Sequence, residues 1–167
     1  LPPRPHTNIY KSPVFYPLMQ LIGFNLKKIL AQKALEFKRG PINTNIEFSD
    51  VKEEEVPLLK DSNAVKISFI FSISYAHPEK TQDAPLENLG EVSFEGEMMF
   101  SVTKDEFKEI TKSWKKKQIP DQFRVPLINF ILTKCSTKAL SLEDDLNIPF
   151  HIPFPQVRPE NKAQQDQ

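Results

Sequence analysis

The stretch from Leu89 to Ile110 constrains the fold most, because its hydrophobic period changes in the middle. From Val92 to Val102 every second residue is apolar or small and most of the others are Glu or Ser, which is typical of a half-buried strand. After Thr103 the apolar residues follow at helical spacing: Phe107, Ile110 and Trp114. Thr103 and Glu106 stand where a capping box would begin that helix. The sequence therefore predicts a strand that runs directly into a helix.

Three further strands are predicted upstream. The clearest covers residues 65–75, where every odd position is apolar and most even positions are polar. A second begins after the Gly40-Pro41 break, with apolar residues at Ile42, Ile46 and Phe48. The first is expected at about residues 20–33. Because the last two strands are joined by a non-helical loop, we expect them to pair antiparallel.

Two helices follow the strands. The first is predicted from about Lys104 to Lys117, and its final lysines suit either the negative end of the helix dipole or a phosphate-binding patch. After Pro120 a long second helix carries an apolar seam at alternating spacings of three and four: Val125, Ile128, Leu132, Cys135, Ala139, Leu142 and Leu146. Such a seam packs either against a second copy of the chain or across the chain's own sheet, and both arrangements are compatible with the pattern.

The segment from Asn147 to Pro159 alternates prolines with apolar residues. Proline excludes helix and central strand, so we expect an extended strap that docks on another part of the protein. The sequence divides into a proline-rich arm or leader (1–18), one domain (19–158) and a polar tail (159–167).

The composition bounds the function. Lys plus Arg equals Asp plus Glu at 22 each, so no overall field favours nucleic acid or an anionic membrane as partner. Cys135 is the only cysteine, which indicates a reducing, cytoplasmic setting. No apolar run approaches the length of a membrane-spanning helix, and no signal peptide is expected. Thirteen Phe indicate either a Phe-rich core or Phe side chains that face a groove for apolar ligands.

No set of residues predicts catalysis or metal binding. The three histidines, His6, His77 and His151, lack the spacing of metal ligands on one helix face. Cys135 lies on an apolar helix seam, where a thiol behaves as a buried hydrophobe. Gly96, inside a strand, indicates a bulge or a close approach of another backbone. We therefore expect a protein that is not an enzyme and that needs no cofactor or metal.

The order of these elements resembles the SecB family of protein-export chaperones. The block "LGEVSFEGEMMF" is similar to the family's final strand. The block "PLINFILTKCSTKALSLEDDLNIPFHIPFPQV" is similar to its long second helix and proline-rich tail, as found in divergent SecB-like proteins. The resemblance covers about residues 20–158 and implies an α+β fold: a four-stranded antiparallel sheet packed on two C-terminal helices, in chains that associate into dimers or tetramers.

The resemblance also implies a function. SecB-like proteins are ATP-independent holdases that bind unfolded or non-native polypeptides in apolar grooves. The resemblance implies that the segment linking the first two strands and residues around the second helix line the groove. On this chain the expected client-binding residues are Phe37, Ile42, Ile46, Phe48, Phe150, Ile152 and Phe154. The seam of the second helix supplies the expected oligomer interface: Val125, Ile128, Leu132, Cys135, Ala139 and Leu142.

The balanced charge departs from the family, whose classical members are strongly acidic. This departure places recognition of the SecA motor, and with it a link to protein export, in question. Two functions survive: a general holdase, or a dedicated adaptor that holds one specific partner, for example an antitoxin, without general chaperone activity.

Overall fold

The computed structural model describes residues 19–57, 63–78 and 88–157 of the chain. Four strands precede two helices, as the sequence predicts: β1 (Gln20–Lys33), β2 (Ile42–Glu54), β3 (Asn63–Ala76), β4 (Asn88–Val102), α1 (Lys104–Trp114) and α2 (Asp121–Asp145). The predicted 1–18 arm lies outside the described residues, as do the tail and the last residue of the predicted domain. Among the described residues, no helix is long and apolar enough to cross a membrane.

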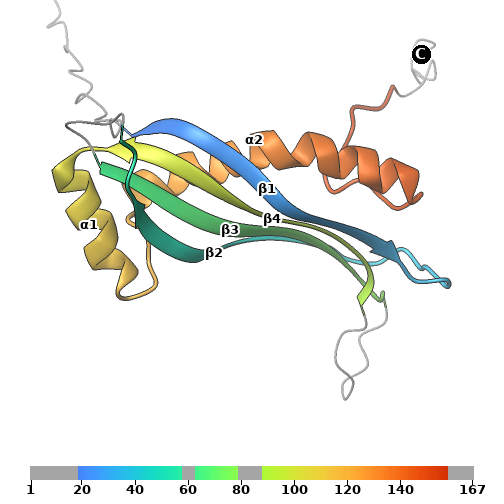
Figure 1. Ribbon diagram of the computed structural model, residues 1–167. Helices are drawn as coiled ribbons and strands as arrows, with labels where there is room; N and C mark the ends of the chain where they lie inside the picture. Colours follow the sequence, from blue (N-terminus) through green and yellow to red (C-terminus); the bar gives the residue numbers. More distant parts are fainter. Residues whose placement is uncertain (1–18, 58–62, 79–87, 158–167) are drawn as a thin grey trace, which may run out of the picture.

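The strands form one antiparallel sheet in the order β1-β4-β3-β2, so β1 and β2 are its edges (Figure 1). Phe71 pairs with Phe94 and Ile67 with Met98, which brings the apolar faces of the two central strands together. The opposite face is polar and carries ion pairs such as Lys28–Glu95 at 2.9 Å. Because alternate residues point to opposite faces, only one face of the sheet offers an apolar surface to the helices.

The junction between β4 and α1 is the predicted capping box. The backbone N–H of Glu106 donates to the Thr103 hydroxyl, and the Glu106 carboxylate accepts from the backbone N–H of Thr103. The helix ends at Trp114, three residues before the predicted end. Lys117 then adopts a left-handed conformation with φ 57°, which reverses the chain toward α2. The lysines therefore lie mainly in this turn and not in the last helical turn.

The long helix α2 runs behind the sheet in the view of Figure 1. It begins directly after Pro120, as the sequence predicts, and its buried residues recur every fourth position: Phe123, Leu127, Ile131, Cys135, Ala139 and Glu143. This row, and not the predicted seam as a whole, packs on the sheet. The two sets share only Cys135 and Ala139, because a row at a spacing of four drifts around a helix relative to one at alternating three and four.

Gly96 is placed by close contact, as its sequence context indicates. It pairs with Leu26, next to a register shift in β1. A Cβ atom at position 96 would lie 2.7 Å from the backbone oxygen of Asn25 and 2.9 Å from the Phe69 ring. Glycine therefore lets the β1 backbone and a core aromatic ring approach β4 together.

The fold class is the predicted one: a four-stranded antiparallel sheet with two C-terminal helices on its apolar face. Every apolar residue at the odd positions of 65–75 is buried. The second strand extends past the predicted apolar residues to Glu54 as an edge strand. An edge position allows this acidic end, because one side of the strand faces solvent.

Candidate functional site

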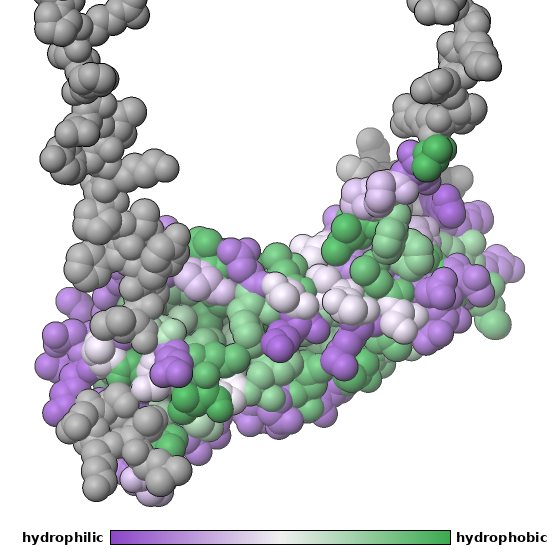
Figure 2. All heavy atoms as spheres, turned by 90° about the horizontal axis from the view of Figure 1, so that it is seen from above, coloured by the Kyte–Doolittle hydropathy of each residue, from purple (hydrophilic) through white to green (hydrophobic). Residues whose placement is uncertain are grey.

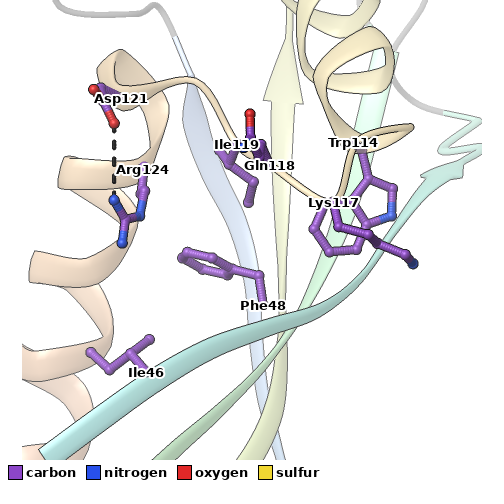
Figure 3. A pocket seen from close by; sticks show the side chains of 8 residues that line it. All are labelled: Ile46, Phe48, Trp114, Lys117, Gln118, Ile119, Asp121 and Arg124. Carbon is purple, nitrogen blue, oxygen red and sulfur yellow. Dashed lines mark ion pairs between the residues drawn. The ribbon is translucent and has the colours of Figure 1, made fainter.

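An open pocket of about 450 Å³ lies between the edge strand β2, the end of α1 and the start of α2 (Figure 3). Its volume is within the range of small-molecule and side-chain binding sites. The lining combines apolar and charged side chains: Ile46, Phe48, Trp114, Lys117, Gln118, Ile119, Asp121 and Arg124. The pocket can therefore receive an apolar group and place charges around it.

Ile46 and Phe48 reach the pocket because β2 is an edge strand. They pair with Phe71 and Phe69, so they share the apolar face that the helices cover. Among the described residues no strand flanks β2 on its outer side, and both residues are only half-buried although they pack against the core. Their apolar surface is thus partly open to a ligand.

Two cations stand on different sides of the pocket. In Figure 3, Arg124 comes from the α2 side and Lys117 from the turn after α1. Arg124 lies 4.0 Å from Asp121 in an exposed pair, and Lys117 Nζ lies 4.7 Å from the centre of the Trp114 ring. Exposed pairs of this length contribute little free energy, so both cations remain available to an outside group.

A buried hydrogen-bond cluster fixes the start of the strap. Glu143, fully buried on α2, accepts a hydrogen bond from the Tyr75 hydroxyl at 2.7 Å. Its other carboxylate oxygen accepts from the His151 backbone N–H at 3.2 Å, and the His151 ring Nδ1 lies 2.8 Å from Oε1. Burial, the hydrogen bond to Glu143 and its charge raise the pKa of Tyr75 well above its usual range. We call Tyr75, Glu143 and His151 the strap anchor.

Beyond the anchor the strap carries apolar side chains to the surface. Phe150, Ile152 and Phe154 are 39%, 41% and 55% exposed. The rings of Phe150 and Phe154 pack edge to face with centroids 5.1 Å apart. The space-filling view shows hydrophobic residues reaching the surface in several patches between polar ones (Figure 2). Apolar surface of this kind, left open in one chain, is typical of interaction sites.

Four of the seven predicted client-binding residues pack beside the core, Phe37, Ile42, Ile46 and Phe48, whereas the strap residues Phe150, Ile152 and Phe154 are exposed. Two of them, Ile46 and Phe48, line the pocket. Phe37 and Ile42 lie near the other end of β2. The Phe37 ring contacts the Tyr75 ring of the strap anchor, and Ile42 pairs with Tyr75 across the sheet. The start of the strap packs on the central strand β3, where the His151 ring contacts Phe71 and the Tyr75 hydroxyl lies 2.9 Å from the Pro149 carbonyl oxygen. We call these seven residues together with the pocket the β2 surface.

The predicted oligomer-interface residues separate into three groups. Cys135 and Ala139 are fully buried against the chain's own sheet, so they offer no surface to a second copy. Val125 is 56% exposed. Ile128, Leu132 and Leu142 are half-buried, and the last two pack beside the core. The prediction fails for Cys135 and Ala139 because the row that faces the sheet passes through both of them.

Several residues of the site were not predicted from the sequence. Lys117 and Arg124 are brought together only by the turn between α1 and α2. Trp114 was expected on the inward stripe of the first helix and Ile119 lies in the connection after it. Neither position indicates in the sequence that the two side chains line one pocket. Glu143 was missed because an acidic run at 143–145 is typically exposed, as Asp144 and Asp145 are. The sequence feature that could have indicated its burial is its position four residues after Ala139, on the row of buried α2 residues.

The other titratable residues give no reactive centre within the described ranges. Burial raises the pKa of the Cys135 thiol to about 11, so the thiol stays protonated and unreactive at neutral pH. In 19–57, 63–78 and 88–157, no three or more His, Cys, Asp and Glu side chains cluster as metal ligands.

Comparison with known proteins adds one likeness. No family model matches the chain, and no curated protein matches it. Among solved structures it is similar to the SecB-like chaperone of Mycobacterium tuberculosis in complex with a peptide from the HigA1 antitoxin. The identity is 16% and the TM-score 0.41, over 85% of this chain and 93% of the other. The architecture of the described residues, a four-stranded antiparallel sheet followed by two C-terminal helices, is the one that the resemblance noted in the sequence implies.

Proposed function

We propose that this protein binds segments of non-native polypeptide along the β2 surface, as a holdase that uses no nucleotide and forms no covalent bond. One observation carries the proposal: Ile46 and Phe48 of an edge strand stay half-exposed and line an open pocket, and Ile42 of the same strand pairs with Tyr75, which contacts the start of the strap. An extended peptide could lie along this line. Ile42 to Phe48 alone span roughly 20 Å of strand.

The chemistry of an unfolded segment suits such a surface. An unfolded chain presents apolar side chains without fixed shape, so its receptor needs an extended row of apolar contacts. Each apolar side chain that is fully buried contributes roughly 1.5 to 3 kcal/mol. Several separate contacts on one chain raise the total affinity by effective concentration. The pocket, β2 and the strap together supply such contacts.

Assembly into a homodimer or homotetramer in the cytoplasm belongs to the same proposal. The exposed apolar residues Ile22 and Ile29 on the edge strand β1, with Val125 on α2, support it, since such surface is buried in stable oligomers. Light scattering at tens of micromolar tests it. We expect a dimer or tetramer, and a strictly monomeric species would contradict this part of the proposal.

A second candidate is a dedicated adaptor for one partner, such as an antitoxin. The pocket favours it in one respect, because its small volume and paired cations suit a defined side-chain pattern better than an arbitrary one. A link to protein export is compatible with either candidate. The two differ in how many clients they accept.

Aggregation of several unrelated denatured proteins separates these candidates. Each client is diluted from denaturant with the full chain at near-stoichiometric ratio and without nucleotide, and light scattering is recorded. A holdase suppresses aggregation of most clients, whereas an adaptor leaves all of them unaffected. The matched control is the Ile46→Ser/Phe48→Ser variant, checked for native circular dichroism. Equal suppression by this variant would exclude the β2 surface as the binding site.

A further inference from the structure

The pocket of the β2 surface carries a local charge that the chain as a whole lacks. Its lining holds two cations, Lys117 and Arg124, and one carboxylate, Asp121. The nearby strand carboxylate Asp50 is already bound to Lys52 at 2.7 Å. Lys115 and Lys116 are exposed in the same turn as Lys117. A neutral protein thus presents a positive rim around an apolar pocket.

The turn after α1 determines where Lys117 points. The backbone N–H of Lys117 donates to the Trp114 carbonyl at 2.8 Å, and that of Gln118 donates to the Ser113 carbonyl at 3.3 Å. These bonds close the turn around the left-handed residue. The Lys117 ammonium then lies over the Trp114 ring, itself a lining residue. Lys117 is thereby held beside the apolar floor and within electrostatic range of Asp50, and among the described residues its ammonium group makes no hydrogen bond. Its three donors can bind a negatively charged group.

Arg124 reaches the same pocket from the first turn of α2. Its guanidinium makes one long ionic contact, with Asp121 at 4.0 Å and both side chains more than half exposed. Five donors on a planar group leave most of its hydrogen-bonding capacity unused by that contact. A carboxylate entering the pocket can therefore bind Arg124 without breaking a strong internal bond.

We propose that the pocket accepts one bulky apolar side chain of a bound polypeptide, and that Lys117 and Arg124 bind an acidic residue beside it. The inference rests on the proposed polypeptide binding and names its preferred sequence: a large aliphatic or aromatic residue flanked by Asp or Glu. A flanking Lys or Arg is disfavoured, because it would face two cations across the pocket. Charge complementarity of this kind mainly sets selectivity between partners.

Three labelled peptides test the preference. They share one core of Leu and Phe and differ only in the flanking residues, which are Glu, Gln or Lys. Binding to the full chain is followed by fluorescence anisotropy at low and high salt. The emission of Trp114, the only tryptophan in the sequence and a lining residue, provides a second signal. We expect the Glu peptide to bind roughly three- to tenfold more tightly than the Gln peptide at low salt, and the Lys peptide more weakly than either.

The variant Lys117→Gln/Arg124→Gln should bind the Glu and Gln peptides equally. The matched control, Lys115→Gln/Lys116→Gln, also removes two positive charges, but from the turn after α1 and not from the pocket lining, and should retain most of the preference. Equal affinity of the wild type for the Glu and Gln peptides would overturn this inference while leaving polypeptide binding intact. So would a preference that Lys117→Gln/Arg124→Gln leaves unchanged. Failure of all three peptides to bind would overturn the proposed function as well.

Discussion

Replacing Tyr75 by Phe tests the strap anchor with the loss of a single hydroxyl. In the native chain this hydroxyl lies 2.7 Å from the Glu143 carboxylate and 2.9 Å from the Pro149 carbonyl oxygen. Tyr75 is 1% exposed and Glu143 is fully buried, so water cannot replace the lost donor without opening the structure. The ring keeps its packing in the variant. The change therefore isolates the hydrogen bond to a buried carboxylate.

The expected cost follows from that geometry. A hydrogen bond to a charged group contributes about 1.5 to 3 kcal/mol to folding stability. The two contacts from His151 still hold the carboxylate in the variant, so the cost should stay within that range. For a chain of this size, each kcal/mol lowers the melting temperature by about 2 to 4 °C. We expect Tyr75→Phe to melt roughly 3 to 12 °C below the wild type.

Urea and thermal unfolding at pH 7 provide the measurement, with Asp144→Asn as the control. Asp144 is exposed at the C-terminal end of α2 next to Glu143, so its substitution should change stability by less than about 0.5 kcal/mol. Hydrogen exchange of the His151 amide should also quicken in Tyr75→Phe. If Tyr75→Phe is as stable as Asp144→Asn, the hydroxyl does not contribute to the anchor and the reasoning fails.

The pH dependence gives an independent check. Burial raises the pKa of Tyr75 in the folded protein above its ordinary value of 10.0. The unfolded chain then releases the proton at lower pH than the folded chain. The stabilising contribution is complete below pH 10 and declines as the pH rises above it. Tyr75→Phe should lack this part of the alkaline decline. An identical alkaline profile in both proteins would contradict the assignment.

Three further predictions follow from the packing. Gly96→Ala should destabilise the fold by about 1 to 3 kcal/mol in urea unfolding, because its methyl group would overlap the β1 backbone, and unchanged stability would contradict that contact. Phe69→Ser should lower the free energy of unfolding by more than about 3 kcal/mol, whereas Ile42→Ser/Phe48→Ser should leave a folded protein that binds clients weakly. If both variants are destabilised equally, Ile42 and Phe48 serve the core and not client binding. Cys135 should resist thiol reagents in the native state at pH 8, and rapid labelling of the native protein would show that the helix opens. The contribution of the protonated thiol to folding stability should decline as the pH rises from 9 through about 11, because the thiol of the unfolded chain ionises first.

Sequence periodicity predicts the sheet and its junction with α1 well, because local patterns dominate there. Strand 65–75 is buried on alternate residues in a central strand, so its pattern has no competing interpretation. The capping box at Thr103 and Glu106 needs only residues three apart, and both of its hydrogen bonds form. These features depend on neighbours in sequence, which is why they can be predicted without the fold.

The long helix shows where the same reasoning fails. Apolar residues surround most of α2, so two rows fit helical spacing and the pattern alone does not select the row that faces the sheet. The register of packing against β4 and β3 makes the choice, and that register is a tertiary property. Likewise Glu143 is buried only because Tyr75 and His151, distant in sequence, supply its hydrogen-bond partners. For this reason hydrophobic periodicity predicts neither the buried face of α2 nor the strap anchor.

The candidate site was predicted in part. Ile46 and Phe48 were expected to bind clients because the family resemblance implies an apolar groove, and both line the pocket. The charged rim was not predicted, since Lys117 and Arg124 meet across a turn whose conformation depends on a left-handed lysine. Sequence patterns thus indicate the apolar part of the site, and the fold adds its charges.

Hydrogen exchange with a denatured client protein in excess tests the central claim most directly. If the protein holds polypeptide on the β2 surface, amides in β2 (42–54), the α1–α2 turn and the strap should exchange more slowly with client present, while those of the central strand β3 stay unchanged. Slower exchange confined to other parts of the chain, or none at saturating client, would contradict polypeptide binding at this surface.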